Sequence, residues 1–167
     1  MNSPFKHISI LIGLVVLQTL VLNQVNINGF INPYVFPLFF LLLSFDTKPW
    51  VLMLSAFFLG LFIDLFNGTL GMHAFSCTLM AYLRPFFLST FQPKTDKYNA
   101  PSITYHGSSW MLLYVTAMLF VHHLCYFFLE AGSLVNFFHT LLLFFISLIT
   151  SVFISFLLLF TFNSKAK

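Results

Sequence analysis

The chain has 167 residues, of which 59% are hydrophobic, 20% are aromatic and only 7% are charged. A soluble domain carries roughly a quarter charged residues, so this composition excludes a protein whose surface faces water over most of its area. The formal net charge is +3, but the seven lysine and arginine residues form no patch, and we therefore expect no nucleic-acid partner.

Apolar runs recur from one end of the chain to the other, and a transmembrane helix uses about 20 residues. The sequence therefore predicts an all-α protein, a single integral membrane domain over residues 1–167 with about six transmembrane helices. The second apolar run is short for a span, so it either extends toward Phe30 and Ile31 or is a tilted, partly re-entrant piece. In chain order the predicted spans are residues 8–22, 34–45, 50–66, 71–91, 110–129 and 137–162, and residues 92–109 form the long loop.

The basic residues predict the orientation of these spans. When the N-terminus is placed inside, every lysine falls on the inner side, whereas the outer segments 25–33, 67–70 and 130–136 contain no Lys or Arg. The positive-inside rule thus predicts that both termini and the long loop are cytoplasmic. Arg84 lies in the inner half of the fourth span, where we expect it to snorkel toward the inner headgroups, and the adjacent Pro85 could mark a kink.

Asp64 is the residue that the membrane makes most costly. A carboxylate in an apolar run costs roughly 3 kcal/mol, so it needs a cavity, a partner or a place near the membrane boundary. The orientation places Asp64 within a turn of the outer boundary. Ala56, Gly60 and Asp64 recur every four residues, and small residues on a helix face let another helix approach closely. Together with Gly71 and His73 on the next helix, they predict a packing face, either within the chain or toward a partner.

The orientation also gathers ionisable side chains in the outer half of the membrane. Besides Asp64 and His73, this outer polar cluster contains His122, His123, Glu130 and His139. The cluster either lines a cavity that opens outward or provides hydrogen bonds between helices. Its possible metal ligands are scattered over three helices and lack the spacing of HExxH or CxxC motifs, so we expect no metal and no other cofactor.

Two further patterns involve serines. Ser76 and His73 are three residues apart on one helix, but no nucleophile motif surrounds them, so we expect no catalytic residue and no enzyme. Ser147, Ser151 and Ser155 form a stripe on the last span, which predicts another helix contact face.

The phrase GLFIDLFNGTLGMHAF, followed by AYLRP, resembles the rod shape-determining protein family MreD. In that family a helix that ends in a Gly-x-x-x-Asp pattern turns into a Leu-Gly-x-His start of the next helix. The similarity extends over most of the chain, and the segments Ile31–Phe45 and Val121–Ala131 also resemble the family. The motif positions in this sequence are Gly60, Asp64, Leu70, Gly71 and His73.

The resemblance implies a non-catalytic scaffold in the bacterial cytoplasmic (inner) membrane that helps to maintain cell shape. Such a scaffold binds the single-span membrane protein MreC and works with the actin-like filament MreB. The wider elongation complex includes the transglycosylase RodA and a penicillin-binding protein that synthesise side-wall peptidoglycan. The resemblance also implies a fold similar to that of ECF-transporter substrate-binding subunits. The alternative function is therefore a small-molecule (vitamin-like) binding membrane subunit of a transporter, with the outer polar cluster as its ligand site.

Overall fold

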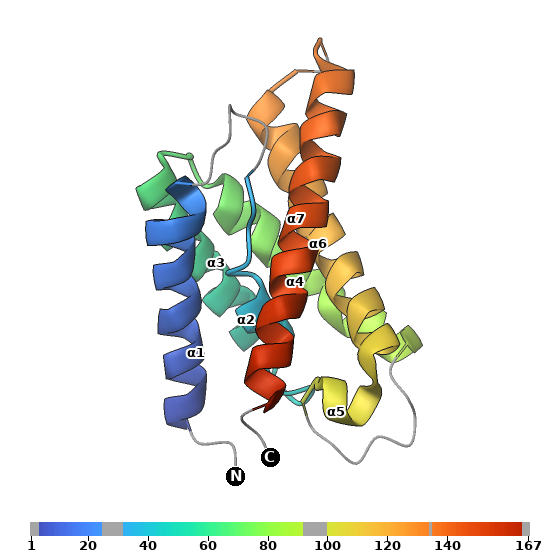
Figure 1. Cartoon of the computed structure of the whole chain (residues 1–167). Coiled ribbons are helices and arrows are strands. Elements are labelled where there is room, and N and C mark those ends of the chain that lie inside the picture. Colours follow the sequence, from blue (N-terminus) through green and yellow to red (C-terminus); the bar gives the residue numbers. More distant parts are fainter. Residues whose placement is uncertain (1–3, 25–31, 92–99, 134, 165–167) are drawn as a thin grey trace.

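A computed structural model of the chain describes residues 4–24, 32–91, 100–133 and 135–164. Every regular element in these ranges is helical, which confirms the all-α prediction for this part of the chain. A π-helical turn (Leu17–Val21) and a 3-10 turn (Leu22–Gln24) extend the first helix. The helices are α1 (Pro4–Val16), α2 (Leu38–Leu41), α3 (Pro49–Asn67), α4 (Met72–Phe91), α5 (Ile103–His106), α6 (Ser108–Ala131) and α7 (Phe137–Ser164), as labelled in Figure 1.

Three of these helices are long and apolar enough to cross a membrane: α3, α6 and the part of α7 from Phe137 to Thr161. They indicate a membrane protein. The first helix with its extension, Ile8–Gln24, is apolar but shorter. Residues 92–109, predicted as a long loop, include α5 and the first residues of α6. Residues 92–99 lie outside the described part of the chain.

The predicted helical span over residues 34–45 is wrong. Residues 32–35 have no regular structure, residues 36 and 37 form a turn, and α2 has only four residues. Pro33 and Pro37 explain the difference, because proline lacks a backbone N–H and disfavours helix in the residue before it.

The segment from Pro33 to Leu41 is the centre of the hydrophobic core rather than a peripheral connection. Val35, Phe36, Leu38 and Phe40 have no exposed surface. In Figure 1 this segment passes through the middle of the bundle, with α1 to one side of it and α7 to the other. Non-helical backbone at membrane depth is tolerated where protein surrounds it, and this segment meets that condition.

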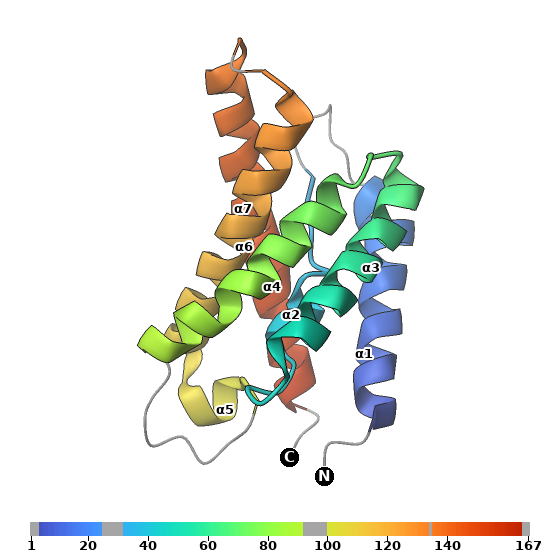
Figure 2. The same cartoon turned by 180° about the vertical axis from the view of Figure 1, so that it is seen from behind.

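The helices around this segment pack in chain order. The closest pairs are α3 with α4, α4 with α6, and α6 with α7. Seen from behind, α3 and α4 lie side by side and α4 continues across to α6 (Figure 2). The beginning of α1 and the end of α7 lie at the same end of the molecule, opposite the α3–α4 and α6–α7 turns (Figure 1).

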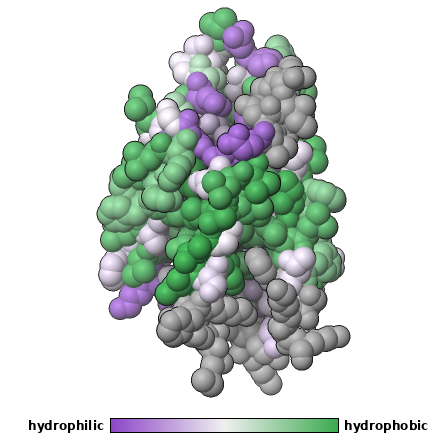
Figure 3. All heavy atoms as spheres, turned by 60° about the vertical axis from the view of Figure 1, so that its left-hand side comes forward, coloured by the Kyte–Doolittle hydropathy of each residue, from purple (hydrophilic) through white to green (hydrophobic). Residues whose placement is uncertain are grey.

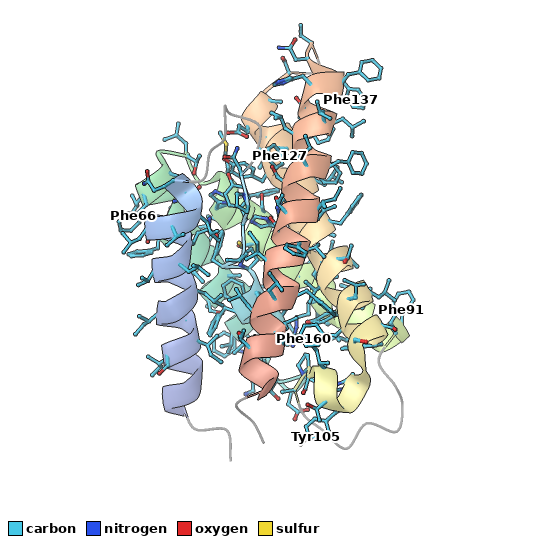
Figure 4. All side chains as sticks on the ribbon, viewed as in Figure 1. Phe66, Phe91, Tyr105, Phe127, Phe137 and Phe160 are labelled. Atoms are coloured by element: carbon cyan, nitrogen blue, oxygen red, sulfur yellow. The ribbon has the colours of Figure 1, made fainter. Side chains whose placement is uncertain are left out.

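The outer surface is strongly apolar. Large hydrophobic side chains such as Leu65, Phe138, Ile149 and Phe153 are more than half exposed. Figure 3 shows a broad hydrophobic area across the middle of one face and hydrophilic residues gathered toward its upper part. Among the labelled side chains of Figure 4, Phe137 projects outward from α7, whereas Phe127 on α6 is buried. An apolar belt with a polar end is the surface that a bilayer requires.

Candidate functional site

Asp64 holds the start of α4. It lies one turn before the end of α3 and its side chain is only 3% exposed. Its Oδ1 atom accepts a hydrogen bond from the backbone N–H of His73 at 3.0 Å, and its Oδ2 atom accepts one from Ala74 at 2.9 Å. The hydroxyl of Thr69 also donates to Oδ1. Three donors from the following turn and helix therefore converge on one side chain.

Through these hydrogen bonds Asp64 caps the N-terminus of α4. The first backbone N–H groups of a helix have no partner within that helix and are usually capped by the side chain that precedes it. The residue before Met72 is Gly71, which has no side chain and has a φ of 78°, a value that favours glycine. Asp64, from the preceding helix, supplies the missing cap. A carboxylate at a helix N-terminus is also favoured by the helix dipole.

Gly60 lets α4 approach α3 at the same place. A Cβ atom at Gly60 would lie 2.6 Å from the Cα of Ala74 and 2.7 Å from the carbonyl oxygen of His73. Ala56, one turn earlier, has no exposed surface. Of the two uses expected for this face, the structure therefore shows packing within the chain. At Gly60 the backbone of α4 already occupies the space that a partner helix would need.

The structure divides the outer polar cluster. His122 and His123 are fully buried and lie beside His73, whose ring stacks on Tyr126 with a centroid distance of 4.2 Å. Tyr34 belongs to the segment from Pro33 to Leu41, called the central segment from here on. Its ring contacts all three imidazole rings. Glu130 and His139 are not part of this buried group. Both are exposed at the α6–α7 end, where the hydroxyl of Tyr126 donates to Glu130 Oε1 at 3.2 Å.

Two serines of the α7 stripe bind the backbone of the segment that includes Tyr34, and Ser151 also contacts His123 on α6. The hydroxyl oxygen of Ser151 accepts from the N–H of Tyr34 at 2.8 Å, and that of Ser147 accepts from Asn32 at 3.2 Å. Gln18 completes this anchorage, because its Oε1 accepts from Val35 and its Nε2 donates to the carbonyl of Pro33. Gln18 and Tyr34 were not predicted as site residues from the sequence. An amide in the first apolar run, opposite a proline-containing segment, was the available signal.

His123 also serves this anchorage. Its Nδ1 lies 2.8 Å from the carbonyl oxygen of Leu119 and its Nε2 lies 2.9 Å from the hydroxyl of Ser151. A carbonyl can only accept, so Nδ1 carries a proton, and in the neutral ring Nε2 accepts from Ser151. A serine beside a histidine is the pair that a hydrolase needs. Here both residues are fully buried and the Ser151 oxygen is held by the Tyr34 N–H, so the pair supports the backbone.

Ser76 and His73, which the sequence places three residues apart on one helix, have different hydrogen-bond partners. The hydroxyl of Ser76 donates to the carbonyl of Met72 at 2.7 Å, one turn back along α4. The Nε2 atom of His73 instead lies 3.2 Å from the amide nitrogen of Asn67.

Arg84 is buried inside the protein rather than extended to the surface as a snorkelling side chain would be. Its side chain is 2% exposed, and its guanidinium donates to the carbonyl oxygens of Leu43 and Ser44 and to the hydroxyl of Tyr114. That hydroxyl in turn donates to the carbonyl of Leu41. The carbonyls that end a helix lack partners, and the five donors of an arginine can satisfy several of them. Pro85, the next residue, lies inside α4, which continues to Phe91.

A pocket with a volume of ≈ 470 Å³ opens near the α3–α4 turn. It is bounded by the extension of α1, the start of the central segment, the α3–α4 turn and the end of α6. Glu130, Tyr34 and Tyr126 contribute to its wall, whereas the three buried histidines do not. Across the described residues, no group of three or more His, Cys, Asp or Glu side chains is placed to hold a metal ion.

No family model, no curated protein and no solved structure matches this chain.

Proposed function

We propose that this protein is a non-catalytic scaffold of the bacterial cell-elongation complex, similar to MreD. The observation that carries the proposal is the α3–α4 unit. Of the five residues that carry the resemblance, Gly60, Asp64 and His73 are buried together where α3 meets α4, Gly71 forms the turn before α4, and Leu70 is exposed. A pattern that builds a helix junction is a structural signature, not a catalytic one.

The use of the buried polar groups supports a scaffold over an enzyme. Asp64 is engaged by two backbone N–H groups and a hydroxyl, and Arg84 is engaged by two backbone carbonyls and a phenol. A catalytic acid or nucleophile needs free access to a substrate. These side chains are instead committed to the fold.

We further propose six crossings within a single domain of the cytoplasmic membrane, with both termini inside. The α1 helix, the central segment and α4 would cross the bilayer together with the three long apolar helices. Lys48, exposed directly before α3, supports this orientation, because α3 begins toward the end of the molecule where α1 starts and α7 stops (Figure 2). A reporter fused after Lys167 should be active only in the cytoplasm. Activity outside the membrane would reject this topology.

The proposed partner is a single-span membrane protein similar to MreC, through which the chain would act with an MreB-like filament, a RodA-type transglycosylase and a penicillin-binding protein. The small-residue face of α3 is filled by α4, so the partner must use another surface. Gly13 on α1 is exposed, and no heavy atom lies within 4 Å of the position that its Cβ would occupy. A glycine in an exposed helix face allows close approach of another helix, and we therefore place the partner on α1.

Depletion tests the scaffold proposal at the level of the cell. In a rod-shaped bacterial host that carries no second copy, loss of the protein should produce rounded cells. If the cells kept their rod shape after complete depletion, the proposal would be wrong.

A second candidate function is the small-molecule-binding subunit of a transporter. The pocket near the α3–α4 turn favours it, because clefts of about 300–1,000 Å³ are typical of ligand sites. Recovery of an ATPase-driven energising subunit together with the purified chain would select this function over the scaffold.

A further inference from the structure

The pocket near the α3–α4 turn has a floor and a rim of different character. Tyr34 and Tyr126 line it but are only 5% and 2% exposed, so their rings form its floor. Glu130 also lines it but is exposed at the end of α6, which places this carboxylate at the rim. The hydroxyl of Tyr126 donates to Glu130 Oε1, so floor and rim are joined by a hydrogen bond.

The floor is held rigid by the packing behind it. The ring of Tyr126 stacks on the ring of His73 at 4.2 Å, and the rings of Tyr34 and Tyr126 meet edge to face at 4.9 Å. Stacked and edge-to-face pairs of this kind fix ring orientation. The aromatic surface of the pocket is therefore formed before any ligand enters.

Side-chain amides form another part of the lining, and hydrogen bonds link them to one another. The amide nitrogen of Asn23 donates to the amide oxygen of Asn67, while Gln18 donates to Asn23 at 2.9 Å. The amide of Asn67 in turn contacts His73 Nε2. This chain of amides connects the extension of α1 to the end of α3. It leaves the pocket with a wall of neutral donors and acceptors in a fixed arrangement.

The charged side chain that lines the pocket is acidic, and no basic side chain in the described part of the chain balances it there. Among the described residues that line it, Glu130 is the only acidic residue, and none is Lys, Arg or His. An anionic ligand would meet this carboxylate with no cation to offset it. An acyl chain would meet amides and hydroxyls, which cost free energy when they lose water without a new partner. A positively charged ligand gains from the carboxylate, with which it can form a charge-assisted hydrogen bond or an ion pair.

We propose that this pocket binds a small organic cation, an amine or quaternary ammonium compound that also carries hydrogen-bonding groups. The positive group lies near Glu130 and the two tyrosines, and the amide wall holds the polar remainder. The pocket volume accommodates a ligand of this size. The inference does not rest on the scaffold function, because a scaffold and a transporter subunit can each hold a ligand at this place.

Equilibrium dialysis of the purified full-length protein in mild detergent tests the inference. The probes are radiolabelled choline and benzyltrimethylammonium, with 3,3-dimethylbutan-1-ol as the uncharged analogue of choline. We expect saturable binding of at least one cation and at least tenfold weaker binding of the alcohol. Glu130→Gln should weaken cation binding about tenfold, the factor that loss of one charge-assisted contact of ordinary strength produces.

Two variants separate this site from a general effect of charge or folding. Asp46→Asn removes an exposed carboxylate between α2 and α3, outside the pocket, and should leave cation binding unchanged. Thr19→Trp fills the pocket from the π-helical turn after α1 and should abolish binding, provided that the variant elutes as a monodisperse peak. No saturable binding of either cation to the wild-type protein would overturn the inference. Equal binding of choline and its uncharged analogue, or binding that Glu130→Gln leaves intact, would also overturn it.

Discussion

Asp64 and His73 are nine residues apart in the sequence, yet Asp64 Oδ1 lies 3.0 Å from the backbone nitrogen of His73. The two residues belong to different helices, and the hydrogen bond closes the turn between them. The cap explains how a carboxylate can be almost completely buried in a chain with so few charges. It also defines what substitution of Asp64 should do.

Asp64→Ala should lower the free energy of unfolding by about 1–2 kcal/mol, because the N–H groups of His73 and Ala74 lose their shared acceptor. Asp64→Asn keeps one acceptor oxygen and should cost less. Thermal unfolding of the purified protein in detergent measures both changes. Asp46→Asn, which changes an exposed carboxylate, serves as the control and should leave the melting temperature unchanged. Equal stability of wild type and Asp64→Ala would refute the capping role.

Gly60→Ala should destabilise the protein by about 1–3 kcal/mol, the usual cost of overpacking a well-filled interior. The added methyl group would lie 2.6 Å from the Cα of Ala74, and a backbone atom cannot move aside without shifting α4. The matched control is Gly13→Ala, where no heavy atom lies within 4 Å and alanine has the higher helix propensity. The same thermal measurement should show a lower melting temperature for Gly60→Ala alone. A destabilised Gly13→Ala with an unaffected Gly60→Ala would contradict the packing described for α3 and α4.

Ser151→Ala and Ser155→Ala should differ although the two serines are one turn apart on α7. Ser151 bonds to both Tyr34 and His123, so its loss leaves buried polar groups unpaired and should cost about 1–3 kcal/mol. The hydroxyl of Ser155 is buried and has no hydrogen-bond partner. Ser155→Ala should therefore be neutral or stabilising. Urea or thermal unfolding in detergent distinguishes the pair, and equal effects would show that the central segment is not anchored by Ser151.

Arg84→Lys should destabilise the protein although it keeps the positive charge. A lysine ammonium cannot match the planar guanidinium that reaches Leu43, Ser44 and Tyr114 together. At least one buried acceptor would lose its partner, at a cost of about 1–3 kcal/mol. Tyr114→Phe removes one member of the same network and should lower the melting temperature by a smaller amount. If Arg84→Lys were as stable as wild type, the side chain would be better described as snorkelling, as the sequence first suggested.

The long apolar helices could be predicted closely from the sequence. The span predicted at residues 50–66 is Pro49–Asn67, and the one at 110–129 lies within Ser108–Ala131. Length and hydropathy suffice for such elements, because a bilayer demands long apolar helices. The central segment could not be predicted in this way. An apolar run indicates that a segment is buried. Burial alone does not distinguish a helix from non-helical backbone whose N–H and C=O groups are hydrogen-bonded by side chains from other elements.

The site residues show the same limit. The spacing of Ala56, Gly60 and Asp64 predicted a packing face, but spacing does not say which helix fills it. For Arg84 the predicted depth in the membrane suggested the lipid headgroups as partner. Its actual partners, the carbonyls of Leu43 and Ser44, could not be predicted, because these carbonyls come close to Arg84 only when the chain folds. His122 and Glu130 were grouped by depth, yet one is fully buried and the other is exposed. Depth along a helix does not specify the direction of a side chain around it.

The central claim, that the chain is a scaffold for a single-span partner, is tested most directly by purification from its own host in mild detergent. Co-purifying proteins are identified by mass spectrometry for wild type, Gly13→Ala and Gly13→Leu. We predict that wild type and Gly13→Ala recover an MreC-like single-span membrane protein, and that Gly13→Leu loses it while remaining monodisperse. Recovery of an ATPase-driven energising subunit in place of a single-span partner would contradict the account.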